Sequence, residues 1–452
     1  MKKTMNQDLT EGNITASLLR FAFPMMLGNL LQQLYNIVDT LIVGRFLGKE
    51  ALAAVGSSYS LMTFLTSILL GLCMGSGVAF SIYYGKREWS RMKSCMFLSF
   101  VMIAAVSALV SAIVFAGMDV ILALLQVPQD IYGLMREYLW VIFLGITATF
   151  LYNYFASLLR AVGNSVVPLL FLGISALLNI GLDLWFIIGL SRGVRGAAEA
   201  TVLSQYVSGM GIMAYTILRF PQFRLKRENL RWQPEILKEI FQLSFLTCIQ
   251  QSVMNFGILM IQGLVNSFGA VVMAAFSVAV KIDTFAYMPV QDFGNAFSTF
   301  VAQNYGAGKK ERIREGLRCA VRAALVFGVG VSVIVFLSAR PLMLIFVKPQ
   351  EIDVIRVGMS YLRIEGSFYC LIGFLFLWYG YYRAVRRPGM SVVLTVISLG
   401  TRVVLAYALS GIPSVGVTGI WAAVPIGWFL ADAAGYIYYL YIKSGHLAEF
   451  SI

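Results

Sequence analysis

Residues 110–115 read VSAIVF, and residues 331–336, which lie 221 positions further along the chain, read VSVIVF. The same offset pairs Gly48 with Gly269, Ala53-Ala54 with Ala274-Ala275, and Tyr84-Gly85 with Tyr305-Gly306. After a two-residue insertion the offset becomes 223, and it pairs Arg160-Ala161-Val162 with Arg383-Ala384-Val385. Matches that keep one register over about eighty residues indicate an internal duplication.

The composition of the 452-residue chain is that of an integral membrane protein. Hydrophobic residues make up 59% and charged residues 13%, and the mean hydropathy is +0.78, far outside the soluble globular range. Apolar stretches of about 20 to 30 residues recur, each long enough to cross a hydrocarbon core about 30 Å thick. We therefore predict twelve transmembrane helices, at residues 16–44, 52–82, 95–118, 132–158, 165–190, 196–218, 237–267, 273–301, 317–338, 355–381, 389–410 and 416–441.

Each copy of the repeat holds six of these helices. An even number returns the chain to the side where it began, so both copies enter the membrane in the same orientation. We predict an all-α integral membrane fold of two parallel six-helix repeats that form two lobes around a central cavity. The lobes are residues 1–218 and 237–452, joined by a cytoplasmic linker at 219–236. A site between such lobes is typical of carriers that work by alternating access.

Basic residues determine the predicted orientation. They concentrate in the connections after the even-numbered helices, at residues 86–93, 160, 219–238, 309–318 and 383–387, and they are sparse on the other side. By the positive-inside rule these connections and both termini face the cytoplasm. The formal charge of +13 then reflects topology in a plasma membrane. No nucleic-acid partner is expected, because the sequence offers no soluble basic face.

Other reactive positions are interpreted as structural. The five cysteines are scattered without a CxxC pair, and the single histidine, His446, has no partner cluster. Neither a zinc site nor histidine catalysis is expected, and the protein is predicted to be no enzyme and to need no cofactor. Asn13-Ile14-Thr15 matches a glycosylation sequon, but on the cytoplasmic side we prefer to interpret it as a helix cap.

Asp39 interrupts the first predicted helix, in the stretch NIVDTLIVG at residues 36–44. A charge near the bilayer centre costs at least about 2.5 to 3.5 kcal/mol, so such an acid is expected to face a cavity, an ion or a partner. A purely structural hydrogen bond between helices is the alternative. Asp39 belongs to a polar stripe on one face of its helix, formed by Asn29, Gln32, Gln33, Asn36, Asp39 and Thr40.

Two further helices of the first lobe carry matching polar groups. Asn179 and Asp183 lie one turn apart on the same face of the fifth helix. On the sixth helix Ala197, Thr201, Gln205 and Ser208 share a face. Two carboxylates, an amide, a hydroxyl and a backbone carbonyl are oxygen donors that a small hard cation prefers, and two close carboxylates equally favour a proton. The second repeat lacks this set, since its matching positions hold Met260, Arg402, Ala406, Ile420 and Val424.

Four segments carry a resemblance to a known family. They read LYNIVDTLIVGRFLG at 34–48, LLRAVGNSVVPL at 158–169, LNIGLDLWFI at 178–187 and GVRGAAEATVLSQ at 193–205. Together with the duplication, they resemble the multidrug and toxic compound extrusion (MATE) family over nearly the whole chain. The resemblance implies a secondary transporter that exports cationic amphiphilic compounds in exchange for Na⁺ or H⁺. It places the cation site on Asp39, Asn179, Asp183 and Thr201, with the Ala197 carbonyl as a fifth donor. Separately, we expect a functional monomer.

Candidate substrate contacts are less specific. In the first lobe they are Gln33, Tyr35, Asn36, Tyr152, Asn153 and Gln205, and in the second Gln251, Asn255, Asp292 and Glu365. The charged residues of the second lobe have an alternative role as mutually paired structural groups, and they are Lys281, Asp283, Asp292, Arg363, Glu365, Arg402 and Asp432. The alternative function is a lipid-linked saccharide flippase of the same superfamily, which a cavity dominated by Lys281, Arg363 and Arg402 would favour.

Overall fold

The computed structural model describes residues 7–124 and 127–444, and within them it is built of helices without a strand. His446 and both chain termini lie outside the described residues. The first repeat consists of α1 (Ile14–Phe46), α2 (Lys49–Gly85), α3 (Trp89–Ala116), α4 (Met118–Leu124), α5 (Gln129–Ile142), η1 (Phe143–Gly145), α6 (Ile146–Ala161), α7 (Val166–Leu184), η2 (Trp185–Gly189) and α8 (Gly193–Arg219). Two short turns, η3 (Pro221–Phe223) and η4 (Arg227–Leu230), follow.

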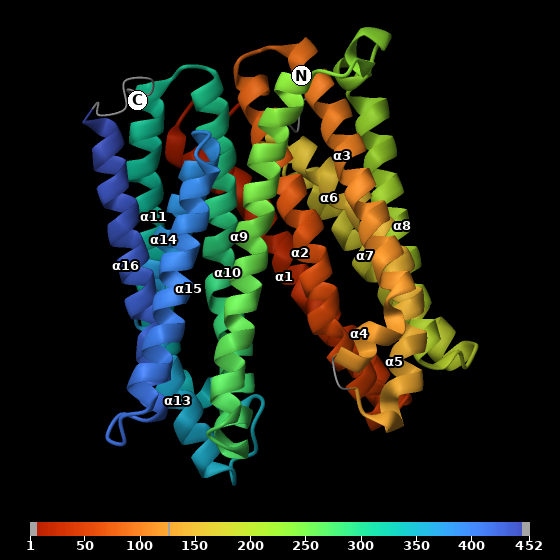
Figure 1. Cartoon of the computed structure of the whole chain (residues 1–452), viewed down its shortest axis with the longest axis vertical. Helices are drawn as coiled ribbons and strands as arrows, with labels where there is room; N and C mark the ends of the chain where they lie inside the picture. The colour runs from red at the N-terminus through yellow and green to blue at the C-terminus, as the bar shows by residue number, and fades with distance from the viewer. Residues whose placement is uncertain (1–6, 125–126, 445–452) are drawn as a thin grey trace. The chain divides into compact units, whose positions relative to one another are not determined.

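The second repeat has the same order of α-helices (Figure 1), and in its described residues it has no counterpart of the turns η1 and η2. It consists of α9 (Pro234–Asn266), α10 (Ala270–Gly306), α11 (Lys310–Leu337), α12 (Ala339–Leu344), α13 (Ile352–Gly366), α14 (Tyr369–Ala384), α15 (Pro388–Ser410) and α16 (Val417–Lys443). In each copy a short helix, α4 or α12, follows the third span, and the fourth span is broken in its middle. The predicted duplication is thus confirmed down to its irregular elements.

The number of spans agrees with the prediction, although one of them, α8, is less apolar than the others. Within the described residues, ten segments are long and apolar enough to cross a membrane, and α13 with α14, bent by 52° at their break, forms an eleventh. The predicted helix at 196–218 is present as α8, which has 27 residues. Its middle is rich in serine, glycine, glutamine and tyrosine, so it is less apolar than the others.

The described chain divides by its contacts into two compact units. Unit 1 holds Phe23–Cys248 and, before them, Gln7 and Asp8, whereas unit 2 holds Leu9–Ala22 and the chain from Ile249 onward. The division by contacts therefore runs through α1 and α9. Most of α1 belongs to unit 1, and so does the first half of α9.

Small residues bring the helices of each unit close together. In unit 1, a Cβ added to Gly75 of α2 would lie 2.4 Å from the Cα of Ser244 in α9, and the hydroxyls of Ser76 and Ser244 are 3.0 Å apart. In unit 2, a Cβ on Gly380 of α14 would lie 2.5 Å from the carbonyl oxygen of Gly294 in α10. Such contacts are typical of helix packing in membranes, where dispersion and interhelical hydrogen bonds replace hydrophobic burial.

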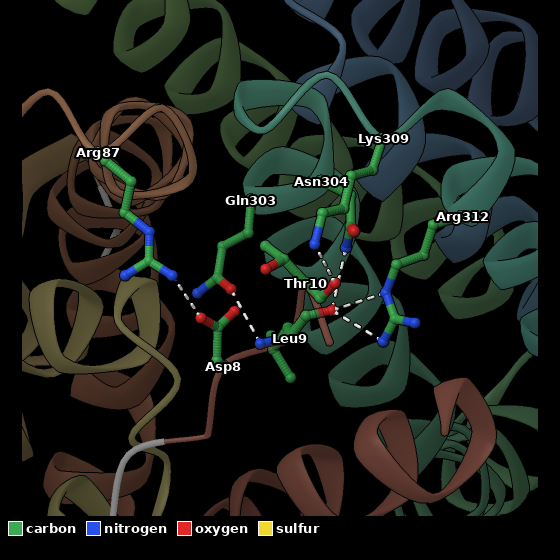
Figure 2. Close-up of polar contacts among 8 residues, drawn as sticks. All are labelled: Asp8, Leu9, Thr10, Arg87, Gln303, Asn304, Lys309 and Arg312. Atoms are coloured by element: carbon green, nitrogen blue, oxygen red, sulfur yellow. Dashed lines mark hydrogen bonds and ion pairs between the residues drawn. The ribbon is translucent and has the colours of Figure 1, made fainter. Parts of the chain in front are cut away.

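The residues Gln7–Gly12, which we call the N-terminal strap, precede α1 and are bound mainly through their backbone. Figure 2 shows contacts of Asp8, Leu9 and Thr10. On unit 1, the N–H of Gln7 donates to the carbonyl of Gly163 (3.1 Å), and Asp8 pairs with Arg87 (2.8 Å). Asn13 then begins α1, because its Oδ1 accepts the N–H of Ala16 (3.0 Å). This confirms the interpretation of Asn13 as a helix cap.

The rest of the strap binds to the α10–α11 region of unit 2 (Figure 2). The N–H of Leu9 donates to Gln303 Oε1 (3.2 Å), and its carbonyl accepts from Asn304 Nδ2 (3.1 Å). Lys309 donates to the carbonyl of Thr10 (2.7 Å). The Arg312 guanidinium reaches the carbonyls of Leu9, Glu11 and Gly12 at 2.6 to 3.3 Å. Leu9 is fully buried there.

Candidate cation site in unit 1

The candidate site lies at the end of α7, where the helix changes its geometry. Asp183 occupies the last turn of α7, immediately before the π-helical turn η2. Wider turns of this kind are rare and occur frequently at functional sites. The helix packs along α8, and two hydroxyls bond across the contact, from Ser175 to the carbonyl of Ser204 (3.0 Å) and from Ser208 to the carbonyl of Phe171 (3.1 Å).

This packing buries the polar face predicted from the sequence. Asp183 is fully buried, and Asn179 is 2% exposed one turn before it. The Asn179 Nδ2 donates to the Oγ1 of Thr201 on α8 (3.3 Å). Ala197, one turn before Thr201, is also buried. The structure therefore places Asn179, Asp183, Ala197 and Thr201 along one contact between two helices.

Asp39 approaches the same place from α1. Its carboxyl group and that of Asp183 interact electrostatically. Four buried oxygens of this set accept no hydrogen bond from a described residue, namely Asp39 Oδ1, Asn179 Oδ1 and both carboxylate oxygens of Asp183. Buried polar atoms are nearly always paired in folded proteins, so these four acceptors are the atoms of the cluster that are available to a proton or a cation.

The donor set fits a hard monovalent cation as well as a proton. It offers carboxylate, amide and hydroxyl oxygens and no sulfur or imidazole, which is the preference of hard ions. The described residues contain no group of three or more His, Cys, Asp or Glu side chains suited to a metal ion. With only two acids, the cluster matches a single positive charge better than a multivalent metal.

The structure adds one residue that the sequence analysis missed. Tyr138 of α5 is 4% exposed and lies within electrostatic range of Asp39, Asp183 and Tyr35. It belongs to the buried face of α5, together with Met135, Leu139 and Ile142. A hydroxyl on an otherwise apolar buried face was the available signal, and its O–H is a donor that two carboxylates can accept.

The predicted substrate contacts of unit 1 divide into two places. Tyr35 lies near Asp39, Tyr59 and Tyr152, so it adjoins the cation site. The Tyr152 hydroxyl donates to the carbonyl of Pro168 (3.1 Å). Gln33 and Asn36 are half-buried on α1.

Asn153 and Gln205 both form a hydrogen bond with Thr149 of α6. Asn153 donates to the Thr149 carbonyl (2.8 Å), and Gln205 Oε1 accepts from the Thr149 hydroxyl (3.4 Å). Gln205 and Thr149 line a pocket of about 40 Å³ together with Thr66 and apolar side chains of α2, α3 and α5. This space is enough for about two or three water molecules and far too small for an organic cation.

In unit 2, Glu365 is the predicted contact with the most developed surroundings. It is 2% exposed and lies within electrostatic range of Arg402 and the hydroxyl of Tyr361, while Asp283 lies near Glu365 and Arg402. Asp292 is likewise buried, at 3% exposure. Gln251 and Asn255 are half-buried on α9.

The remaining charges of unit 2 differ in their surroundings. Lys281 is exposed. Arg363 is exposed and stacks over the ring of Phe336 at 5.4 Å. Both carboxylate oxygens of Asp432 are buried without a hydrogen-bond donor among the described residues. Within the described chain, Lys281, Arg363 and Arg402 form no ion pair closer than 4.0 Å, although Arg402 interacts electrostatically with Asp283 and Glu365.

Comparisons with known proteins identify the family. The MatE family model matches residues 24–185 and 244–408. The chain is 30% identical to the probable multidrug resistance protein YpnP of Bacillus subtilis, covering 96% of both chains. It is 28% identical to the probable multidrug resistance protein NorM of Thermotoga maritima, covering 90% of this chain and 88% of the relative.

A solved structure shares the fold. The outward-facing conformation of a multidrug resistance MATE family transporter superposes with a TM-score of 0.90 at 24% identity, covering 97% of this chain and 98% of that chain. The family match extends over both copies of the repeat, including α1 from Pro24 onward and the segment that holds Asn179 and Asp183. The protein is therefore a member of the MatE family of multi-pass membrane transporters.

Proposed function

We propose that this protein is a secondary antiporter that exports cationic, amphiphilic organic compounds in exchange for Na⁺ or H⁺ by alternating access. The family and the names of its relatives support multidrug export. The observation that carries the coupling is the set of four buried oxygens without a donor, on Asp39, Asn179 and Asp183. A membrane protein that keeps two acids so placed gains from a positive charge that enters and leaves.

In the proposed mechanism, each residue of the site has a distinct task. Asp39 and Asp183 supply the negative charge, and Asn179 and Thr201 supply neutral oxygens whose mutual hydrogen bond (3.3 Å) holds α7 against α8. The Ala197 carbonyl is a further candidate donor. With no cation or proton, two nearby carboxylates repel each other in a medium of low dielectric constant.

Binding of one positive charge removes this repulsion and favours closer packing of α1 on α7 and α8. Coupling then requires that the ion and the substrate prefer different conformations, because a ligand shifts an equilibrium only by its differential affinity. Tyr138 provides a hydroxyl near both acids, so it is the candidate to orient the empty carboxylates. Tyr35 and Tyr152, beside the cluster, are the aromatic surfaces nearest to it for an organic cation.

The decisive experiment is ethidium transport in proteoliposomes under an imposed Na⁺ gradient, and separately under an H⁺ gradient. Wild type should transport under at least one gradient, and D39N and D183N should lose that gradient dependence. D119N is the control, because Asp119 is an exposed acid of the same unit that pairs with Arg136 (2.8 Å). Gradient-driven export by D39N at the wild-type rate would refute the assigned coupling site.

The proposal includes a location in the plasma membrane with both termini cytoplasmic, and a functional monomer. The flippase alternative rests on bases that face a substrate phosphate, but Arg363 is exposed and stacks on Phe336. Failure to move any organic cation, with transfer of lipid-linked sugars in the same vesicles, would favour the flippase. Lys309 and Lys348 lie on opposite predicted sides of the membrane. The accessibility of a cysteine introduced at each position tests the orientation.

A further inference from the structure

The third spans of the two repeats, α3 and α11, differ from each other in one respect that the transport site does not explain. α3 and α11 correspond residue for residue at an offset of 221, from Trp89 to Lys310 at their starts. Where α3 has Phe97 and Val101, α11 has Arg318 and Arg322. Both arginines are exposed, and neither forms an ion pair closer than 4.0 Å with a described residue, Glu315 three positions before Arg318 included.

These arginines lie on the exposed face of α11. At 3.6 residues per turn, Arg318 and Arg322 fall within about 80° of Val326, Val329 and Val333. Those valines are 48% to 75% exposed within unit 2. The exposed face of α11 therefore changes from arginine to valine along a single stripe.

The length of α11 places both arginines at the membrane boundary. The helix has 28 residues, which is about 42 Å, while the hydrocarbon core spans about 30 Å or 20 residues. Arg340, in the following helix α12, lies just beyond the C-terminal end of α11. Counting about 20 residues back from Leu337 reaches Arg318, so Arg322 lies about one turn, or 6 Å, inside the core.

Aromatic hydroxyls accompany the arginines on the neighbouring helices. α11 packs along α14, and α14 packs along α16. Tyr439 of α16 lies within electrostatic range of Arg314 and Arg318, and its ring contacts those of Trp378 and Tyr381 at 5.7 Å. Arg314 already pairs with Glu311 (2.9 Å), which leaves Arg318 and Arg322 as the cations available to a ligand.

We propose that Arg318 and Arg322, with Tyr439, bind the phosphate of an anionic phospholipid whose acyl chain lies along Val326, Val329 and Val333. Guanidinium groups recognise phosphate oxygens through paired N–H donors, and tyrosine is common at the membrane interface. The leaflet is the cytoplasmic one if the orientation under Proposed function holds, and its anionic lipids attract basic residues. The site itself does not depend on that orientation.

The test measures lipid binding by the full-length protein purified in detergent, by native mass spectrometry and by thermal unfolding, with dioleoyl phosphatidylglycerol against dioleoyl phosphatidylcholine. Wild type should retain phosphatidylglycerol in preference to phosphatidylcholine, and phosphatidylglycerol should stabilise it more. R318Q/R322Q should lower the apparent affinity for phosphatidylglycerol about 25-fold, since each arginine near the surface contributes a factor of about five. Should the double variant fail to fold, R322Q alone should lower it about fivefold.

The control is R340Q/R356Q, which removes the same charge from exposed arginines beyond the other end of α11 and should leave the preference unchanged. R318K/R322K keeps the charge and should retain most of the binding. An equal loss in the control, or no preference in wild type, would show that only diffuse charge attracts lipid and would overturn the site. Equal stabilisation by inorganic phosphate would assign the arginines to a soluble anion instead.

Discussion

Arg312→Gln should release the N-terminal strap from unit 2. In the structure the Arg312 guanidinium makes four hydrogen bonds to three backbone carbonyls, those of Leu9, Glu11 and Gly12, at 2.6 to 3.3 Å. Figure 2 shows the two bonds to Leu9. A glutamine is too short and has too few donors to replace them. The buried N–H of Leu9, which donates to Gln303 (3.2 Å), reports directly on the opening of the strap.

The expected change in the free energy of opening depends on which hydrogen bonds the three carbonyls retain in the variant. The Leu9 carbonyl retains its bond from Asn304 (3.1 Å), and the contacts to Glu11 and Gly12 are exposed, so water replaces part of the loss. Hydrogen bonds to a charged group contribute about 1.5 to 3 kcal/mol each when buried and less when exposed. A net loss of about 2 to 3 kcal/mol is expected, which raises the opening equilibrium about 30- to 150-fold.

The assay is amide hydrogen exchange in detergent, read on peptides that begin before Leu9 and end in α1. The control is R91Q, because Arg91 is the repeat counterpart of Arg312 and pairs with the side chain of Glu88 at 3.4 Å, with 63% of its own side chain exposed. R91Q should leave exchange at Leu9 unchanged. If R312Q exchanges there no faster than wild type, or if R91Q accelerates it equally, the backbone contacts of Arg312 do not hold the strap.

Three further predictions concern unit 1. Asp183→Asn should abolish gradient-driven export and yet raise the midpoint of thermal unfolding, because it removes a buried charge without a donor; a clear fall in that midpoint would contradict the interpretation of the site. Gly75→Ala should destabilise the protein by about 1 to 3 kcal/mol in thermal unfolding, since the new Cβ would lie 2.4 Å from a backbone atom of α9, whereas Gly56→Ala, with open space around it, should cost far less. Arg136 holds the pKa of Asp119 below its ordinary value, so the stability that this pair supplies is present at neutral pH and is lost only as the pH falls through that lowered pKa. Because Asp119 does not titrate between pH 5 and 8, the transport rate of D119N over that range should follow the wild-type profile.

Hydropathy and the repeat were sufficient to predict the helices, because a bilayer leaves few alternatives to a continuous helix. The breaks in the fourth and tenth spans were not predictable in this way. The turn at Phe143–Gly145 lies inside an apolar run without proline. Gly145 lies so close to Gln205 of α8 that a Cβ there would be 2.6 Å from its Oε1. This close approach across helices accompanies the break, and tertiary packing of that kind has no local sequence pattern.

The candidate site was predictable where its chemistry is unusual for a membrane segment. Asp39 and Asp183 stand out because acids are rare in apolar helices, and Asn179 follows from its position one turn from Asp183. Tyr138 was missed because tyrosine is ordinary in membrane helices. The contacts of the strap were missed for a different reason, since Leu9 and its neighbours are bound through backbone carbonyls that carry no side-chain signature.

The duplication separates what the fold requires from what the site requires. The second repeat has the same order of helices, including the short helix after the third span and the break in the fourth, with Met260, Arg402 and Ala406 in place of Asp39, Asn179 and Asp183. The polar set is therefore not needed to build a six-helix copy. Buried acids without donors lower stability, and we propose that a bound cation or proton compensates for this cost at Asp39 and Asp183, whose orphaned oxygens would fit it. The stability and transport measurements on Asp183→Asn test the two halves of this argument separately.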